Sequence, residues 1–398
     1  MKKNINNYLL LYLSILIIFS YFFLYIKHQV GNDSTISEWF INYEGGFTRR
    51  GIIGQFALFQ SRLFELDLRL SIFLLQCTAC TLYFFLLFNL FKNIKTNKVI
   101  YLSIFTPIFI LYPVAEIEVL ARKEIIVFSI FLIYLFIPRT NQFKNLSLII
   151  FLVLSILIWE PIIFFYPLFF LFEIIERNIQ KANLDFFKIF FYFTPSIFIA
   201  LFFITSPISE EQWMIMAGVL KNEFGQNCYM SCGLLNSKST IIQQFQGNFS
   251  KYSFEVFLRY FLIIVIGFFP LHILYKNSFL KNKNLILFSK FKKIESILSL
   301  SLIPVLLLFA MGYDWGRWVN ITYVLLAIVY FYLYKNNLIL LNKKKLDDNI
   351  INKLKGKIFI FFFIVYCFGW NPKTVISGDV ASFPGYRIPY KVFKVLLN

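Results

Sequence analysis

The sequence predicts an all-α polytopic integral membrane protein, and two observations carry that prediction. Of 398 residues, 59% are hydrophobic and 21% are aromatic, and the mean hydropathy is +0.68. Water-soluble domains average about 45–50% apolar residues, so this composition excludes an ordinary soluble protein. The apolar residues also form runs close to the ~20 residues that a membrane-spanning helix needs. We therefore expect a single transmembrane helical domain over residues 1–398.

The formal net charge of +18 has an explanation within the membrane class. The lysines lie in short loops between apolar runs, and cytoplasmic loops of membrane proteins are rich in Lys and Arg. The sequence therefore predicts no nucleic-acid partner. It has no Walker loop and no dinucleotide fingerprint, so no cofactor is expected. The two histidines, His28 and His272, fall on opposite sides of the predicted membrane, and no metal site is expected.

Eleven membrane helices are predicted from the apolar runs. The first follows Lys2 and Lys3 but precedes no small-residue cleavage site, so we expect it to be retained. Residues 146–172 are too long for one span. They are divided at Trp-Glu-Pro (159–161), because proline removes a backbone donor and disfavours helix in the residue before it. The predicted helices are 8–26, 70–90, 99–114, 125–138, two short helices within 146–172, 187–205, 254–275, 297–311, 319–334 and 358–370.

The lysine-rich loops predict the orientation of the chain. A cytoplasmic N-terminus places all of them inside, as the positive-inside rule requires, and leaves the C-terminus in the periplasm. These loops are residues 92–98, 139–144, 177–188, 276–293 and 335–357. The first periplasmic segment, residues 27–68, is expected to contain an amphipathic helix lying in the membrane interface after residue 51. The larger periplasmic loop, residues 206–252, is expected to form a small lobe.

The same topology places the remaining charged clusters on the external side. Ionisable residues near bilayer depth are costly, and they usually mark a site or a buried pair. The clusters are 44–50, 116–124, 159–161, 206–252, 314–317 and the tail around Asp379 and Arg387. Together they predict a polar cavity open to the outside. The alternative is that each cluster is a solvated turn or a helix cap.

Residues 46–51, Gly-Phe-Thr-Arg-Arg-Gly, have the composition of an anion site. Glycines let backbone amides approach an oxyanion, and the guanidinium groups of Arg49 and Arg50 match phosphate or carboxylate in a bidentate fork. A helix that begins near Gly51 directs the positive end of its dipole at the same anion. The alternative is a tight turn whose arginines pair with Glu38 or Glu44.

Residues 314–318, Asp-Trp-Gly-Arg-Trp, place a carboxylate and a guanidinium three residues apart between two indoles. This pattern is typical of a sugar site, in which Trp315 and Trp318 stack on the pyranose while Asp314 and Arg317 bind hydroxyls or phosphate. The alternative is an Asp–Arg pair with the indoles at the membrane interface.

Three acidic residues are candidate catalytic bases. Glu160 follows a long apolar run and precedes a proline, so burial is expected to raise its pKa towards that of a general base. The alternative is a carboxylate that caps the next helix. Glu44 and Asp314 are the other candidates. Arg122, within Ala-Arg-Lys-Glu (121–124), is either a substrate-binding residue or one of several charges that neutralise each other.

The five cysteines divide by environment. Cys228 and Cys232 lie in the larger polar loop and form either a disulfide in an oxidising periplasm or two free thiols. Cys77, Cys80 and Cys367 lie in apolar runs and are expected to be small packing residues.

The motifs occur in a distinctive order along the chain. They are Tyr-Glu-Gly-Gly-Phe-Thr-Arg-Arg-Gly (43–51), Arg-Lys-Glu (122–124), Trp-Glu-Pro (159–161), a cysteine-bearing external loop and Asp-Trp-Gly-Arg-Trp (314–318). In this order they resemble bacterial membrane proteins assigned as O-antigen or capsule repeat-unit polymerases (Wzy-type). The resemblance covers most of the chain as architecture, with short motifs. Compared with that family, this chain has a smaller external loop and its arginines lie nearer the N-terminus.

The resemblance implies a multi-pass glycosyltransferase of the bacterial inner membrane, active in lipopolysaccharide or capsule polysaccharide biosynthesis. Such an enzyme joins undecaprenyl-pyrophosphate-linked oligosaccharides at the periplasmic face. Its implied partners are that lipid-linked oligosaccharide, membrane lipids and a chain-length regulator. Arg49, Arg50 and Arg317 are then expected to bind the substrate, with the first two on its pyrophosphate. Trp315 and Trp318 are expected to line the glycan path.

Two other functions are compatible with the sequence. A lipid-phosphate-sugar glycosyltransferase of the GT-C architecture also has many helices and an acidic residue in its first external loop. Asp33, Glu38 or Glu44 fits that position, although the usual paired-acid motif is not evident. A non-enzymatic transporter or flippase of lipid-linked sugar predicts charged residues in both halves of the membrane. The sequence instead predicts that they collect on one side.

Overall fold

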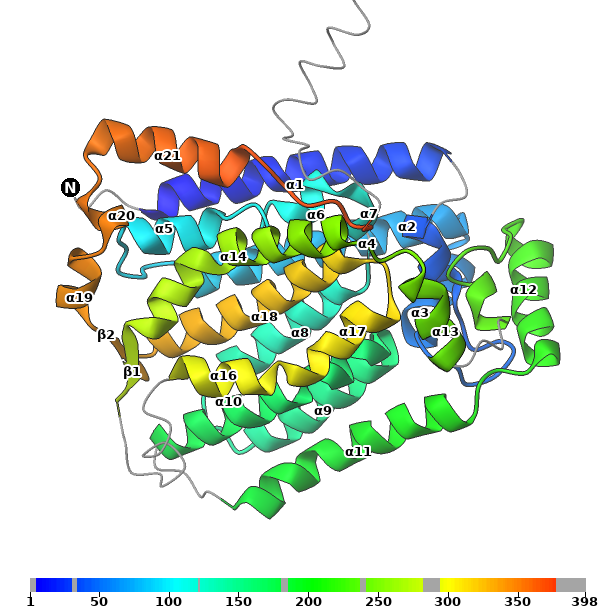
Figure 1. The fold of residues 1–398 in the computed structure, drawn as a ribbon. Helices are drawn as coiled ribbons and strands as arrows, with labels where there is room; N and C mark the ends of the chain where they lie inside the picture. The colour runs from blue at the N-terminus through cyan, green and yellow to red at the C-terminus, as the bar shows by residue number, and fades with distance from the viewer. Residues whose placement is uncertain are drawn as a thin grey trace, which may run out of the picture.

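Long apolar helices run between two ends of the molecule in the computed structural model (Figure 1). The structure describes residues 5–30, 34–120, 122–179, 185–236, 241–281 and 294–376. The predicted cluster around Asp379 and Arg387, and the candidate acid Asp33, lie outside these residues. Within the described residues, six helices are long and apolar enough to cross a membrane, as expected for a multi-pass membrane protein.

The main helices coincide with the predicted apolar runs. They are α1 (Ile5–Val30), α4 (Leu68–Phe91), α8 (Glu124–Phe136), α9 (Lys144–Ile158), α10 (Tyr166–Ile179), α11 (Phe186–Thr205), α14 (Phe254–Lys276), α18 (Trp315–Lys335) and α21 (Gly356–Phe368). Five of these, α1, α4, α11, α14 and α18, are candidate spans, and the sixth candidate is the run 294–311. The apolar helices α8, α9 and α21 are shorter than these spans, and α10 has only 14 residues. The predicted number of eleven spans, and the side on which each end lies, remain predictions.

Proline interrupts three of the predicted runs. Residues 99–114 form α5 (Lys98–Phe105), a turn, α6 (Tyr112–Ala115) and then α7 (Ile117–Leu120), rather than one helix. Thr106, which precedes Pro107, has φ −52° and ψ 139°, as steric conflict with a following proline favours. Residues 294–311 likewise form α16 (Ile294–Ser301), η4 (Ile303–Val305) and α17 (Leu306–Met311). The predicted division at 159–161 is confirmed, because α9 ends there and η2 (Glu160–Phe165) leads into α10.

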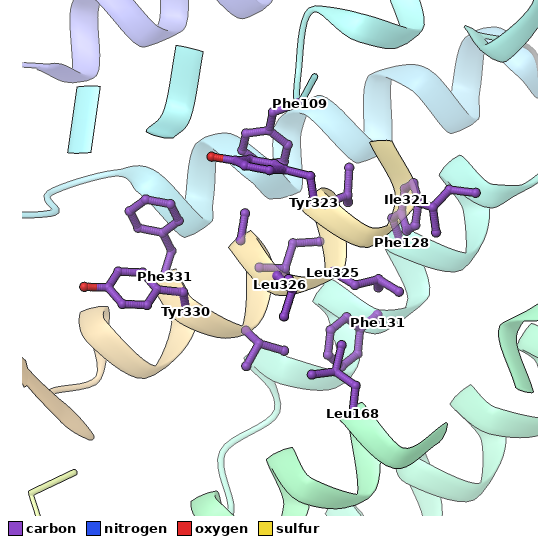
Figure 2. Close-up of a cluster of buried hydrophobic side chains, with 14 of the residues drawn as sticks. Phe109, Phe128, Phe131, Leu168, Ile321, Tyr323, Leu325, Leu326, Tyr330 and Phe331 are labelled. Atoms are coloured by element: carbon purple, nitrogen blue, oxygen red, sulfur yellow. The ribbon is translucent and has the colours of Figure 1, made fainter. Parts of the chain in front are cut away.

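Helix α18 forms the centre of the bundle. Its residues are buried from Trp315 to Leu333, which leaves no face for lipid. Phe128 and Phe131 of α8, and Leu168 of α10, belong to the apolar cluster around it (Figure 2). Because a helix that is apolar on all sides is stable only in a core, α18 fixes the residues at its first turn at the centre of one end of the bundle.

That end, which we call the α3 end, carries the segments predicted to be external (Figure 1). They are α2 (Ser34–Ser37), η1 (Glu38–Phe40), α3 (Gly51–Phe64), α12 (Glu210–Phe224), η3 (Gly233–Asn236) and α13 (Ile241–Phe249). Segments 27–68 and 206–252 pack together through a second apolar core that includes Trp39, Phe40, Met216 and Leu220. The predicted amphipathic helix is α3, which buries small residues such as Ala57 and exposes apolar side chains.

The opposite end, which we call the strand end, contains two short strands, whereas the other regular elements among the described residues are helical. Strand β1 (Ser278–Leu280) pairs antiparallel with β2 (Ile339–Leu341), a small sheet that the all-α prediction did not include. Lys276 and Lys281 lie beside β1 in the sequence, and Lys335 and Lys343 lie beside β2, which is followed by α19 (Lys343–Asp347) and α20 (Ile350–Lys353). Lysine-rich segments therefore meet at the end opposite α3 (Figure 1).

Candidate functional site

The glycine and arginine segment folds into a tight turn followed by α3. Arg50 is the residue before the helix and adopts a left-handed conformation, with φ 61° and ψ 9°. A Cβ atom on Gly51 would overlap the ring of Tyr43, and one on Gly54 would overlap the carbonyl oxygen of Ile41. These glycines therefore allow α3 to lie directly on the chain before it. The expected helix start at Gly51 is confirmed, but in this structure the two glycines serve packing.

Arg50 joins two carboxylates that are distant in the sequence. Its Nε donates to Glu160 Oε2 at 2.6 Å, and its Nη2 donates to Glu160 Oε1 at 2.8 Å. Its Nη1 donates to Glu38 Oε1 at 3.0 Å. Bidentate arginine–carboxylate pairs are among the strongest side-chain interactions. The alternative considered for the turn, a pair with Glu38, is thus present for Arg50.

The ion pairs continue from Glu38 onto the loop before α8. Arg122 Nη1 lies 3.3 Å from Glu38 Oε2. Lys123 is fully buried, and its Nζ donates to the backbone oxygen of Arg50 at 2.7 Å. Three segments that are separate in the sequence therefore meet around Glu38.

A second group of charges lies at the start of α18. Arg317 pairs with Glu124 at the start of α8, and its Nη1 donates to Asp314 Oδ2 at 3.0 Å. The charges of Arg50 and Arg317 both act on Glu38, which links the two groups. We call the set of nine residues the charged network: Glu38, Arg49, Arg50, Arg122, Lys123, Glu124, Glu160, Asp314 and Arg317.

Arg49 and Arg50 differ in what they contact. The side chain of Arg49 is 42% exposed, and its Nη1 lies 3.6 Å from Glu160 Oε1. The side chain of Arg50 is 21% exposed and is held by two carboxylates. Arg49 therefore has donors free for a ligand from outside, whereas Arg50 holds the network together. The sequence could not make this distinction between adjacent arginines.

The arginines set the protonation of the acidic residues. Burial favours a higher pKa for Glu160, but the charge of Arg50 and its hydrogen bonds outweigh that effect and lower the pKa. Burial likewise opposes ionisation of Glu38, yet Arg50 and Arg122 lower its pKa to about 2. The expected rise in the pKa of Glu160 was therefore wrong. For Lys123 the effect of burial prevails over that of the neighbouring carboxylates, and it lowers the pKa to about 7.

Several buried polar atoms beside the network have no hydrogen-bond partner among the described residues. They are Glu124 Oε2, Arg317 Nε, Trp159 Nε1 and Trp318 Nε1. The two indole rings lie 6.1 Å apart. Buried polar groups in proteins are nearly always satisfied, so four such atoms together indicate a place for water or a bound polar group.

The two tryptophans of the Asp-Trp-Gly-Arg-Trp motif have different environments. Trp315 is buried among four rings, with centroids 5.2–5.7 Å away, and its Nε1 is bonded to the backbone of Phe309. In this structure it has no open face on which a sugar can stack. Trp318 is also buried, but it lies beside Trp159 and Arg317 in the charged network. The Asp314–Arg317 pair considered from the sequence is present.

Glu44 lies outside the charged network. It pairs with Arg62 of α3 at 2.8 Å, and Arg62 also pairs with Glu223 of α12 at 2.6 Å. The hydrogen bonds that Glu44 accepts from Arg62 and from Gln55 lower its pKa. Glu44 therefore serves the contact between α3 and α12 in this structure. The described residues supply two other candidate bases, Glu160 and Asp314, to the network.

The segment 206–252 contains a disulfide that closes a short loop. Cys228 and Cys232 are bonded to each other, and their Cα atoms lie 5.2 Å apart. Of the two states considered from the sequence, the structure has the disulfide. Cys77, Cys80 and Cys367 are buried and free.

A second buried charged cluster, which was not predicted from the sequence, lies near the strand end. Arg139 pairs with Glu173 and Glu176 of α10, and Arg177 Nε lies 3.1 Å from Glu173 Oε2. Tyr332 of α18 donates to Glu176 at 2.6 Å. The prediction that charges collect at one side was thus incomplete. The sequence does contain a sign of this cluster. Glu173 and Glu176, three residues apart, continue an apolar helical run and would lie on one face of the helix.

Comparison with protein-family models, with curated proteins and with solved structures found no match to this chain.

Proposed function

We propose that this protein is a membrane glycosyltransferase that joins lipid-pyrophosphate-linked oligosaccharide repeat units at its α3 end. The observation that carries the proposal is the position of Arg49. It is half-exposed beside the Arg50–Glu160 pair, at one end of a bundle of apolar helices. A lipid-linked pyrophosphate approaches such a site from the membrane surface, and a guanidinium with free donors suits its oxygen atoms.

The distribution of lysines supports a periplasmic location for this site. The lysine-rich segments around β1 and β2 lie at the strand end, and such segments stay in the cytoplasm. The α3 end then faces the periplasm of a bacterial inner membrane. The disulfide between Cys228 and Cys232 at that end suits an oxidising compartment.

The chemistry assigned to this site is the transfer of a sugar chain. A hydroxyl oxygen of the acceptor attacks the anomeric carbon of the donor, which forms a glycosidic bond. The bond from that carbon to the pyrophosphate oxygen breaks, and undecaprenyl pyrophosphate leaves with the negative charge. Arg49 stabilises that charge, with Arg317 as a second candidate. The acceptor's proton passes to a carboxylate, for which Glu160 is ionised and adjacent to Arg49.

Deletion of the gene in its host tests this function. The proposal predicts that surface polysaccharide shrinks to single repeat units, with the polymeric ladder lost on a gel. Purified protein with undecaprenyl-pyrophosphate-linked oligosaccharide should then yield longer chains. A normal ladder in the deletion strain contradicts the proposal.

A transporter of lipid-linked sugar is the second candidate, and one observation favours it. The buried cluster of Arg139, Glu173 and Glu176 puts charges at both ends of the bundle, as a transport path requires. Loss of a transporter removes repeat-bearing material completely, because the units never reach the polymerising enzyme. The gel pattern of the deletion strain therefore distinguishes the two functions.

A further inference from the structure

A polar pocket of about 260 Å³ lies near the strand end, away from the charged network. It is formed by the turn after α8, the first residues of α9, the last turn of α10 and the beginning of α11. Its lining includes Arg139, Lys144, Arg177 and Lys188, and Asp185 is the one acidic residue among the described residues that line it. Four cationic side chains around one small cavity favour an anionic occupant.

Arg139 lines this pocket and has unused donors. Its side chain is only 8% exposed. Nη2 binds Glu173 and Glu176, whereas Nε and Nη1 are buried and have no partner among the described residues. A guanidinium has five N–H donors, and burying them without acceptors is unfavourable. The unpartnered side of Arg139 therefore requires an acceptor that the described protein atoms do not provide.

The start of α9 adds to the positive potential. Lys144 is the first residue of this helix and Asn145 the second, and both line the pocket. The residue before them, Phe143, makes no side-chain cap for the amides of the first turn, of which that of Lys144 is bonded to the backbone oxygen of Asn141 at 3.1 Å. The N-terminus of a helix favours an anion through these amides and through the helix dipole. By contrast, α11 is capped by Asp185, which accepts from the amide of Lys188.

The surroundings of the pocket are suited to a lipid. Phe187 and Phe191 flank Lys188 on α11, and they are 88% and 70% exposed. In a membrane these rings contact acyl chains, so a phospholipid beside α11 brings its phosphate to the level of Lys188. Two of the other cations that line the pocket are already engaged. Arg177 is bonded to Glu173 and to Asn145, and Lys144 Nζ donates to the backbone oxygen of Tyr134 at 2.6 Å.

We propose that the pocket between α9, α10 and α11 binds a phosphate group, which comes from a membrane phospholipid headgroup or from free phosphate. This site is separate from the charged network and does not depend on the proposed glycosyl transfer. It ties the beginning of α11 to the ends of α8 and α10 through one shared anion.

Thermal unfolding of the delipidated full-length protein in neutral detergent tests the proposal. The melting temperature is followed during titration with inorganic phosphate, with phosphatidylglycerol and with sodium chloride at matched ionic strength. We expect phosphate or phosphatidylglycerol to raise the melting temperature beyond the effect of the salt. An effect of both indicates that the phosphate group suffices, and an effect of phosphatidylglycerol alone indicates a lipid headgroup. An effect of neither overturns the proposal.

Two variants locate the binding. Arg139→Lys keeps a positive charge beside Glu173 but removes the planar fork, and Lys188→Gln removes an exposed charge with no risk to the core. Each should weaken the apparent affinity about tenfold, the effect of one lost charge-assisted hydrogen bond. Lys357→Gln, an exposed lysine of α21, is the matched control and should titrate like wild type. If both pocket variants titrate like wild type, the assignment of the phosphate to this pocket is wrong. If Arg139→Lys does not fold, Lys188→Gln alone provides the test.

Discussion

Arg50 holds Glu160 through two nearly parallel hydrogen bonds, of 2.6 and 2.8 Å, across 110 residues of sequence. This pair joins the turn before α3 to the turn between α9 and α10. Arg50 also reaches Glu38, so one guanidinium connects three segments at the α3 end. Its neighbour Arg49 shares Glu160 at 3.6 Å but remains half-exposed. The two adjacent arginines therefore have separable roles, one in the fold and one at the surface.

The first prediction separates these roles by stability. Arg50→Ala leaves Glu38 and Glu160 without their main partner, and removing one member of a buried ion pair costs about 3–5 kcal/mol. Arg49→Ala removes a long, partly exposed ion pair and should cost less than about 1 kcal/mol. Thermal unfolding in detergent measures both. Equal destabilisation by the two changes contradicts the division of roles.

The second prediction concerns the pH dependence of Glu38. Its pKa lies at about 2, below the ordinary 4.5, so its carboxylate stabilises the fold fully above pH 4.5 and loses that effect as the pH falls through about 2. Glu38→Gln should cost on the order of 3 kcal/mol at neutral pH. The difference from wild type should narrow as the pH falls below 4.5.

Melting curves at several pH values measure that difference. Asp347→Asn, at an exposed position on α19, is the control and should match wild type throughout. A gap between wild type and Glu38→Gln that stays constant from neutral to acidic pH contradicts the prediction.

The third prediction concerns the close approach of α3 to the preceding chain. Gly54→Ala places a methyl group against the Ile41 carbonyl and should destabilise the protein by about 1–3 kcal/mol. Gly218→Ala is the matched control, because the same change within α12 meets no atom within 4 Å. It should be neutral or stabilising by up to ~1 kcal/mol. The order of the two melting temperatures checks the packing directly.

The fourth prediction distinguishes the candidate bases. Glu160→Gln should lower polymer formation about 10²–10⁴-fold if Glu160 accepts the proton. Glu44→Gln should have little effect on turnover, since Glu44 serves the contact with Arg62. Asp314→Asn tests the remaining candidate within the charged network. Formation of longer chains from lipid-linked oligosaccharide by the purified variants is the measurement. A larger loss with Glu44→Gln than with Glu160→Gln contradicts the site.

Much of the fold was predictable because its signals are local. The apolar runs predicted the main helices, and the prolines at 107 and 304 explain the breaks that were missed. The small two-stranded sheet was not predicted, since two three-residue strands carry almost no periodic signal. The predicted run ended at residue 172, before Glu173 and Glu176, although α10 continues to Ile179.

The candidate site was predictable in composition but not in connectivity. The motifs with Arg50, Arg122, Glu160 and Arg317 were recognised, and the structure brings all four into one network. Which acid pairs with which arginine depends on long-range packing, and the sequence alone leaves it open. The lowered pKa of Glu160 follows from such a contact. A prediction from burial alone therefore gave the wrong sign.

Complementation of the deletion strain with Arg49→Ala, alongside Arg49→Lys and wild type, tests most directly whether Arg49 binds the substrate. If Arg49 binds the substrate, the polysaccharide ladder should be lost with Arg49→Ala, while the purified variant melts within a few degrees of wild type. Partial recovery is expected with lysine, which keeps the charge but not the fork. A normal ladder from Arg49→Ala would contradict the claim that this exposed arginine binds the anionic substrate.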